Sequence, residues 1–274
     1  MPNYRIYPYY LFYKQINIVY NLQISMNRYQ GKVILVTAST AGIGLAIATR
    51  LAQEGGTVIV NSRKESNVEE AVKTIRDKGL KVHGVAGNIS NQESRTKLVK
   101  YIEENFGKLD VLVLNHATSL HYGPTLETKE SAIDKTLETN LKSSILLLQG
   151  LYPLIKKVKG NILIMSSYTG YDPGVKMGVY SLTKSALLGM VKLFAKEFLD
   201  DGVRVNGISP GLIKTKLSEA LWKSKEQEAL KDMGVKRIGQ PEDISNAAAF
   251  LCSSEADYIT GETLSVLGKP SPHL

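Results

Sequence analysis

The chain has 274 residues, 43% hydrophobic and 22% charged, which supports one large hydrophobic core and excludes a fibrous or wholly disordered protein. Its apolar runs are short, and none reaches the roughly 20 uninterrupted apolar residues of a membrane-spanning helix, so we expect a soluble protein. The single cysteine, Cys252, can form neither an intrachain disulfide nor a multi-thiolate metal site, which favours a reducing, cytoplasmic compartment. The four histidines lack an HExxH-like spacing, and no metal is expected.

The formal net charge of +8 does not form a nucleic-acid-binding pattern. Residues 1–30 contribute +3 through Arg5, Lys14 and Arg28 and contain no acidic residue. Elsewhere lysine and glutamate are interspersed along helical faces, as on an ordinary solvated surface. A basic enzyme that binds a multiply phosphorylated cofactor explains this balance, and we expect neither a nucleic-acid partner nor a membrane span.

Residues 1–29 differ from the rest of the chain because they contain half of its fourteen tyrosines and show no regular amphipathic period. They have neither the apolar core and cleavage site of a secretory signal nor the arginine and serine content of a mitochondrial presequence. A membrane-touching or targeting arm and a dispensable extension both fit. We favour the extension, and we expect the folded domain to occupy residues 30–274.

From residue 31 onward, short β-branched runs alternate with longer segments of helical period. Strands that are apolar on both faces and are separated by helices are typical of a parallel sheet covered on both sides. The sequence therefore predicts a single-domain α/β Rossmann fold with a doubly wound, seven-stranded parallel sheet. The strands are predicted at 32–37, 57–60, 81–86, 110–115, 161–166, 203–208 and 262–266, and the main helices at 43–53, 68–78, 93–105, 132–156 and 181–199.

A turn of small residues joins the first predicted strand to a helix. Small side chains let backbone amides approach a pyrophosphate, and the helix N-terminus adds free N–H donors and a partial positive charge. Such turns also close many strand–helix joints without a ligand, but the flanking strand and helix favour a dinucleotide site. The contacts predicted in this turn are Thr37, Ser39, Thr40, Gly42, Ile43 and Gly44.

The end of the second strand indicates which dinucleotide binds. An NAD site needs a carboxylate about 20 residues beyond the glycine turn to hold the ribose 2′-hydroxyl. Ser62, Arg63 and Lys64 stand there instead. A guanidinium can grip a 2′-phosphate through two parallel hydrogen bonds, and a solvated helix start is the weaker interpretation because two basic residues oppose the helix dipole. We predict NADP(H).

Tyr180 and Lys184 lie four residues apart at the start of a strongly helical segment. That spacing puts both side chains on one helical face, where the ammonium can lower the phenol pKa. A tyrosine with its ordinary pKa of about 10 is a poor acid–base catalyst at neutral pH without such help. Taken alone, the pair is explained equally well by an aromatic ring that packs beneath a surface lysine.

Three further motifs accompany this pair. Ser167 ends the fifth predicted strand, Asn140 lies in the preceding long helix, and Ser209–Gly211 follows the sixth strand. With the turn after the first strand, these motifs make residues 31 to about 268 resemble the short-chain dehydrogenase/reductase family. The resemblance implies the strand order 3-2-1-4-5-6-7 and a homotetramer or homodimer.

The resemblance also implies a catalytic set of Asn140, Ser167, Tyr180 and Lys184. Tyr180 would give the proton to the carbonyl oxygen during hydride transfer, and Ser167 would polarise that carbonyl, so both would contact the substrate. Lys184 would lower the Tyr180 pKa and hold the ribose, and Asn140 would hold a water that links Lys184 to solvent. The other cofactor contacts that we expect are Asn88, Ile89, Asn115, Tyr180, Lys184, Pro210, Gly211, Ile213 and Thr215, although Asn88 suits a helix cap equally well.

Five segments are similar to the NADPH-dependent carbonyl and retinal reductases of this family, although some recur in 3-oxoacyl reductases. They imply an NADP(H)-dependent interconversion of a carbonyl and an alcohol on a small hydrophobic ketone, diketone or retinal-like substrate, with residues 212–235 as a substrate lid or a subunit interface. A 3-oxoacyl thioester reductase is the alternative enzyme. A non-catalytic NADP(H)-sensing scaffold is the alternative of another class. The five segments are 37–40, 61–64, 210–215, 239–243 and 258–263.

Several positions depart from the family pattern. Ala38 stands where the family usually has its first glycine. Because alanine has a β-carbon, we expect a negative φ at this residue. His116 stands in an otherwise Asn-Asn-Ala-Gly-like run, where we expect it to pack near the nicotinamide. The chain ends Pro272-His273-Leu274, which disfavours the peroxisomal location known in the family and leaves the cytoplasm as our prediction.

Overall fold

The computed structural model describes residues 27–224 and 226–271 of the chain. The interpretations of residues 1–26 as an extension and of residues 272–274 as an unsuitable import signal fall outside these described residues.

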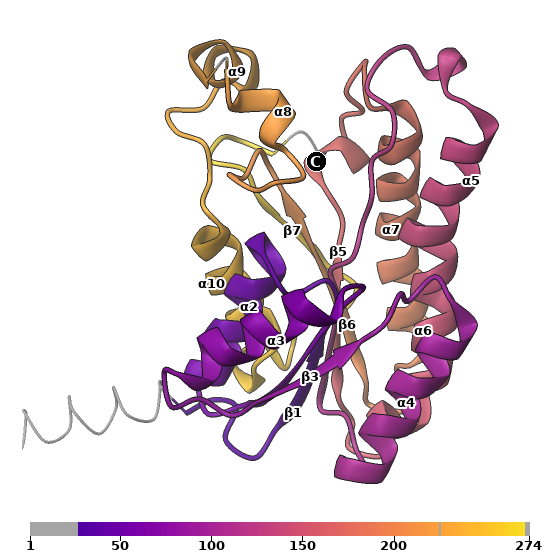
Figure 1. Ribbon diagram of the computed structural model, residues 1–274, viewed down its shortest axis with the longest axis vertical. Helices are drawn as coiled ribbons and strands as arrows, with labels where there is room; N and C mark the ends of the chain where they lie inside the picture. The colour runs from indigo at the N-terminus through magenta and orange to yellow at the C-terminus, as the bar shows by residue number, and fades with distance from the viewer. Residues whose placement is uncertain (1–26, 225, 272–274) are drawn as a thin grey trace, which may run out of the picture.

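Within the described residues, seven strands form one sheet in which every neighbouring pair runs parallel (Figure 1). The sheet order is β3-β2-β1-β4-β5-β6-β7, so the predicted fold class and strand order are confirmed. The direction of winding reverses between β1 and β4, and ligands of open α/β sheets bind at such a reversal, beyond the carboxyl ends of the strands. The strands are β1 (Val33–Val36), β2 (Thr57–Ser62), β3 (Val82–Ala86), β4 (Val111–Leu114), β5 (Asn161–Met165), β6 (Arg204–Pro210) and β7 (Thr263–Val266).

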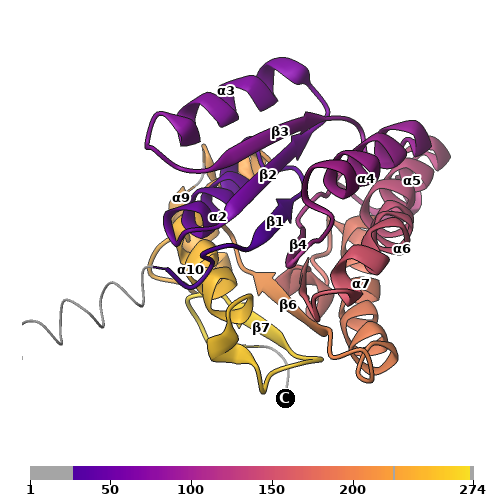
Figure 2. The same cartoon turned by 90° about the horizontal axis from the view of Figure 1, so that it is seen from below.

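Helices cover both faces of the sheet, as Figure 2 shows. One layer contains α2 (Gly42–Gln53), α3 (Glu65–Arg76) and α10 (Pro241–Leu251). The opposite layer contains α4 (Gln92–Phe106), α6 (Ser143–Lys156) and α7 (Gly178–Glu197). Three short helices, α5 (Glu130–Leu137), α8 (Glu219–Trp222) and α9 (Glu226–Met233), lie near the carboxyl ends of the strands (Figure 1).

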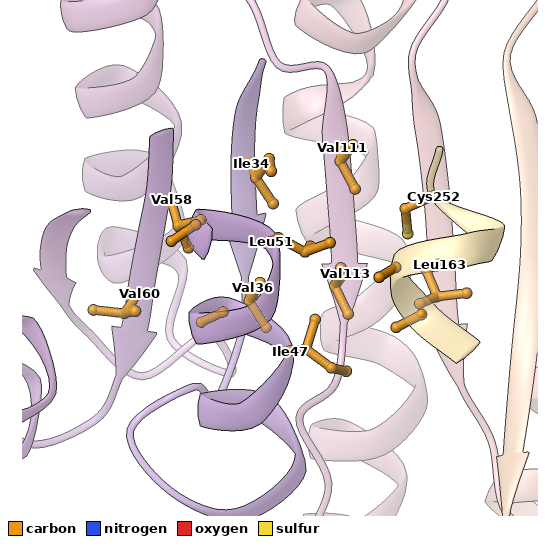
Figure 3. Packing of buried hydrophobic residues seen from close by; sticks show 14 of the residues in the cluster. Ile34, Val36, Ile47, Leu51, Val58, Val60, Val111, Val113, Leu163 and Cys252 are labelled. Atoms are coloured by element: carbon orange, nitrogen blue, oxygen red, sulfur yellow. The ribbon is translucent and has the colours of Figure 1, made fainter. Parts of the chain in front are cut away.

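The four residues of β1 show why the sheet needs both layers. All four are buried, and successive side chains point to opposite faces of a strand. Ile34 and Val36 pack with Ile47 of α2 in one core (Figure 3), whereas Val33 and Leu35 belong to the core under α4, α6 and α7. The continuous apolar run of β1 is therefore divided between two cores.

The long helical segment predicted over residues 132–156 is helical throughout, but it is not a regular α-helix. A π-helical turn, Glu138–Lys142, separates α5 from α6. The apolar period continues through this segment, so it gives no sign of the inserted turn, which often marks a functional site. Asn140 lies in the turn and is fully buried.

The fold also begins earlier than residue 30. Tyr29 is 1% exposed within the core beside α2 and α10, and its hydroxyl donates to the Ala249 carbonyl over 2.6 Å. Arg28 donates to the carboxylates of Glu54 (2.6 Å) and Glu255 (2.7 Å). The predicted boundary is corrected accordingly, because Arg28 and Tyr29 are part of the domain.

Among the described residues, no helix combines the length and apolarity needed to cross a membrane. The same residues contain no group of three or more histidine, cysteine or acidic side chains arranged to hold a metal ion.

Candidate active site

Two adjoining cavities form a groove above the carboxyl ends of β1, β4 and β5. They share Ala38, Ala41 and Ala117, and we call them the catalytic end and the adenosine end of the groove. The catalytic end is lined by Ser167, Tyr180 and Lys184, and also by Gly42, Ile43, Gly44, Asn115, Pro210, Gly211, Ile213 and Thr215. The adenosine end is lined by Thr40, Ser62, Arg63, Asn88 and Ile89 among the predicted contacts. Most of the predicted contacts therefore converge on one groove.

The turn after β1 is held in shape by side chains that face away from the groove. Thr37 and Ser39 are fully buried and do not line it, contrary to their prediction as contacts. The Ser39 hydroxyl donates to the Val36 carbonyl (2.6 Å) and accepts the Asn61 amide (3.1 Å). Both residues thus position the turn beneath a ligand.

Ala38 has a φ of 49°, so the predicted negative φ is wrong. The left-handed region is unfavourable for a side chain with a β-carbon, and here the surrounding hydrogen bonds impose it. The Asn115 amide group donates to the carbonyls of Thr37 (3.1 Å) and Ala38 (3.2 Å). A β-carbon on Gly44 would lie 2.4 Å from the same Ala38 carbonyl, so only glycine fits there.

At the adenosine end, Arg63 follows β2 and lines the groove, whereas Lys64 precedes α3 outside the lining. Lys135 of α5 also lines this end, a cation that sequence reasoning missed because it is distant along the chain. Asn88 accepts the Ser90 amide (3.2 Å), and the cap of α4 is Asn91 rather than Asn88. No aspartate or glutamate is found among the described residues that line this end.

Tyr180 and Lys184 share one face of α7, as predicted, with the Lys184 ammonium nitrogen 5.4 Å from the centre of the tyrosine ring. Lys184 is 2% exposed, and its Nζ donates to the Met165 carbonyl at the end of β5 (2.7 Å). Burial lowers the pKa of Lys184 to about 7. At neutral pH this ammonium is therefore partly deprotonated.

Burial raises the pKa of Tyr180 to about 12, and a hydrogen bond with Ser167 acts in the opposite direction. Desolvation therefore dominates at Tyr180, and the lowering of its pKa by Lys184 stays a prediction. The Ser167 hydroxyl also accepts hydrogen bonds from the amide (3.2 Å) and hydroxyl (3.1 Å) of Thr169. Ser167 and Tyr180 thus share the catalytic end of the groove, with the phenol in its protonated form at neutral pH.

The Asn140 side chain is occupied by protein partners. It accepts the Thr118 amide (2.7 Å) and donates to the Thr118 carbonyl (2.9 Å) and the Thr183 hydroxyl (3.0 Å). Thr183 is the neighbour of Lys184, so Asn140 joins the loop after β4 to the start of α7. Its role in holding a water stays a prediction.

Residues 212–235, the predicted lid, pack around a small core that includes Ile238 just beyond them. Leu212, Ala229 and Ile238 form it, with Trp222 packed against them, and the Trp222 indole donates to the Ser218 hydroxyl (3.2 Å). Leu221 and Leu230 of this segment also pack against that core. Lys216, Leu217 and Ser218 line the catalytic end instead.

His116 lines the adenosine end of the groove and not the catalytic end, although Lys184 is near enough to help lower its pKa. The packing of His116 near the nicotinamide stays a prediction. Its ring is buried between Thr37 and the first residues of α6, Ser143 and Ser144. The distant serines that complete this contact left no signal near His116 in the sequence.

The groove fits a dinucleotide. Gly44 and the shared alanines let a ligand approach the backbone of the turn and the N-terminus of α2, which favours a pyrophosphate. The residues that would hold the cofactor are those of the turn, Arg63 at one end, and Tyr180 and Lys184 at the other.

This sheet order and this groove define a dehydrogenase of the Rossmann class. Residues 37–268 match the family model described as Enoyl-(Acyl carrier protein) reductase. The chain belongs to the short-chain dehydrogenase/reductase family, and it is an oxidoreductase. The predicted family membership is confirmed.

Individual relatives cover most of the chain. Dehydrogenase/reductase SDR family member 4 of Bos taurus is 43% identical over 251 residues, 90% of each chain. Tropinone reductase-like 3 of Erythroxylum coca is 43% identical over 243 residues, 88% of this chain and 93% of the relative. L-sorbose reductase of Gluconobacter frateurii, solved with NADPH and L-sorbose, matches with a TM-score of 0.82 at 30% identity and covers 91% of this chain and 99% of that one.

Proposed function

We propose that this protein is an NADP(H)-dependent reductase that interconverts a carbonyl and an alcohol on a small hydrophobic substrate. The observation that carries the proposal is the convergence of Ser167, Tyr180 and Lys184 on one groove with the glycine turn. The relatives named above are all reductases by name.

The side chains suit the reduction of a carbonyl. When bound, the nicotinamide supplies a hydride for the carbonyl carbon. The Tyr180 phenol, which is protonated at neutral pH, breaks its O–H bond and protonates the carbonyl oxygen as negative charge develops there. Ser167 donates a hydrogen bond to that oxygen and stabilises its developing negative charge. Tyr180 then regains a proton from solvent.

NADP(H) is favoured over NAD(H) by the charges at the adenosine end. Arg63 and Lys135 line this end, and no carboxylate among the described lining residues is available for a ribose 2′-hydroxyl. A guanidinium and an ammonium attract the 2′-phosphate, whereas a carboxylate would repel it. The L-sorbose reductase at 30% identity was solved with NADPH.

Leu217, which is 55% exposed and lines the catalytic end, supports a hydrophobic substrate. Lys216 beside it keeps a 3-oxoacyl thioester as the second candidate, because a cation at the mouth suits a phosphorylated carrier.

Cofactor consumption separates the candidates. NADPH and NADH oxidation is measured with retinal, aromatic ketones, diketones and acetoacetyl thioesters, and Tyr180→Phe serves as the control that lacks only the acid. We expect turnover of a hydrophobic ketone, diketone or aldehyde with NADPH, and loss of nearly all of it in the variant. Turnover of the thioester alone would favour the second candidate. Tight NADPH binding with no turnover would favour a cofactor-sensing scaffold.

We further propose a homodimer or homotetramer in the cytoplasm. Leu182 and Leu193 of α7 and Ile145 of α6 are exposed apolar residues on the layer opposite α2, which supports association. Sedimentation of the purified chain and imaging of a fluorescent fusion test the two parts separately.

A further inference from the structure

His116 is a buried histidine that none of the proposed catalytic steps uses. Its Nδ1 lies 2.8 Å from the Thr37 hydroxyl, and its Nε2 lies 2.9 Å from the Ser144 hydroxyl and 3.2 Å from that of Ser143. The ring therefore spans the space between the cofactor turn and the start of α6.

The serine partners decide which nitrogen of the ring carries the proton. The Ser143 hydroxyl donates to the Thr139 carbonyl (2.7 Å), and the Ser144 hydroxyl donates to the Asn140 carbonyl (3.1 Å). A hydroxyl has one proton to donate, and the Ser143 oxygen lies closer to its carbonyl (2.7 Å) than to Nε2 (3.2 Å), so toward His116 it acts as an acceptor. This geometry favours the ring hydrogen on Nε2.

Nδ1 is then an acceptor, and the Thr37 hydroxyl donates to it. The Val113 carbonyl is the competing acceptor, but it lies 3.2 Å from that hydroxyl and already accepts the Thr37 amide. The Thr37 oxygen in turn accepts the amides of Asn115 (2.9 Å) and His116 (3.3 Å). Burial, with nearby Lys184, lowers the pKa of His116 to about 3, which agrees with a neutral ring.

The two ends of this contact are both parts of the site. Thr37 begins the cofactor turn, and the carbonyls of Thr139 and Asn140 belong to the π-helical turn. The Asn140 side chain continues the chain of hydrogen bonds to Thr183, beside Lys184. A displacement at either end of the ring would thus reach the cofactor turn or the lysine.

We propose that His116 is a positioning residue whose neutral Nε2–H ring joins the cofactor turn at Thr37 to the π-helical turn of Asn140. Its effect on catalysis rests on the proposed function, whereas the hydrogen bonds themselves do not.

Two substitutions remove the two hydrogen-bonding functions of the His116 ring one at a time. In His116→Asn the amide oxygen replaces Nδ1 and the donor to the serines is lost. We expect kcat to fall about tenfold and the NADPH dissociation constant to stay within about twofold. In His116→Gln the amide nitrogen replaces Nε2 and the acceptor for Thr37 is lost. We expect NADPH binding to weaken about tenfold, with kcat recovering toward wild type. Equal changes in both quantities for both variants, or no change, would overturn the proposal.

A double-mutant cycle tests the serine half without reference to any substrate. Ser144→Ala and His116→Asn remove the same hydrogen bond, so their effects on the free energy of unfolding must not add. Additive effects would show that the two residues act independently and would overturn the proposed hydrogen-bonded link through His116. Because this cycle measures folding, it decides the matter even if wild type binds no NADPH and the proposed function fails.

The nitrogen shifts of 15N-histidine-labelled protein report the tautomer directly. We expect a protonated Nε2 and an unprotonated Nδ1 at neutral and mildly acidic pH, and the reverse tautomer or a charged ring would refute the assignment. His83→Asn is the matched control, because His83 is a half-buried histidine on β3 with Nδ1 3.0 Å from the Tyr101 hydroxyl. Loss of His83 should leave NADPH binding, kcat and the His116 shifts unchanged.

Discussion

Gly44 lies directly against the carbonyl oxygen of Ala38, so that a β-carbon at residue 44 would be 2.4 Å from this oxygen and 2.5 Å from the Asn115 amide nitrogen. Backbone and a hydrogen-bonded side chain hold both atoms in place. The first turn of α2 can approach the cofactor turn this closely only because residue 44 has no side chain.

Gly44→Ala should therefore lower the free energy of unfolding by about 1–3 kcal/mol, the usual cost of overpacking, and weaken NADPH binding. Gly189→Ala is the matched control, because a β-carbon at this exposed position of α7 has no neighbour within 4 Å. There alanine should raise the free energy of unfolding by up to about 1 kcal/mol. Denaturant titration of both variants tests this, and equal effects would contradict the close packing of Gly44.

Ala38→Gly should stabilise the protein. Ala38 adopts a φ of 49°, which costs a residue with a β-carbon about 1–2 kcal/mol and costs glycine almost nothing. Glycine loses more backbone entropy on folding, so the expected net gain is about 0.5–1 kcal/mol. A fall in the denaturation midpoint would show that the alanine methyl makes a compensating contact.

The buried Lys184 should make stability depend on pH. Its pKa is lowered to about 7, so between this value and its unfolded value of about 10.4 the unfolded chain binds more protons, and stability rises with pH. We expect a rise of up to about 1.4 kcal/mol per pH unit above pH 7. The raised pKa of the Cys252 thiol makes stability fall with pH, but only from about pH 9 upward. The effect of Lys184 on stability is therefore measured between about pH 7 and about pH 9. If Lys184→Met shows the same rise, the lysine is not its source.

Arg63→Leu should weaken NADPH binding about ten- to a hundredfold, because a charge-assisted hydrogen bond contributes about 1.5–3 kcal/mol. NADH, which lacks the phosphate, should bind almost unchanged, and Ser62→Asp in the same variant should improve NADH binding. Lys64→Leu is the control, because Lys64 does not line the groove and its loss should have a much smaller effect. Calorimetric titration of both cofactors measures these constants. Equal losses for NADPH and NADH would remove the main argument for NADP(H).

Removal of residues 1–26 should leave the melting temperature and activity essentially unchanged, whereas removal of residues 1–30 should not. The second truncation deletes Tyr29, which is 1% exposed, and Arg28 with its two ion pairs. Tyr29→Ala in the full chain should cost about 3–5 kcal/mol, as for other buried aromatic residues. A large loss from the shorter truncation would contradict the interpretation of residues 1–26 as an extension.

The strands, and the shared helical face of Tyr180 and Lys184, were predictable because each leaves a local signal. An apolar run such as β1 must be buried on both faces, and Tyr180 and Lys184 are placed by the spacing of a single helix.

Other features depend on contacts that are distant in sequence. Lys135 reaches the adenosine end only through the fold, and the π-helical turn at Asn140 rests on hydrogen bonds to Thr118 and Thr183. Ala38 adopts a positive φ, and its carbonyl accepts a hydrogen bond from Asn115, which is far along the chain. The pKa of Tyr180 likewise follows from burial, which a spacing does not report.

The position of Arg28 and Tyr29 decides where an N-terminal tag or fused domain joins the folded domain. Both residues precede β1 at its amino end, beside Glu54 after α2, whereas the groove lies at the carboxyl end of the same strand. The entry point of the chain and the entrance for substrate are thus separated by the full length of β1 (Figure 1). An affinity tag, a fused domain or a surface linker joined ahead of residue 27 meets the domain on the side away from the groove, which leaves the approach to Tyr180 open in an immobilised enzyme.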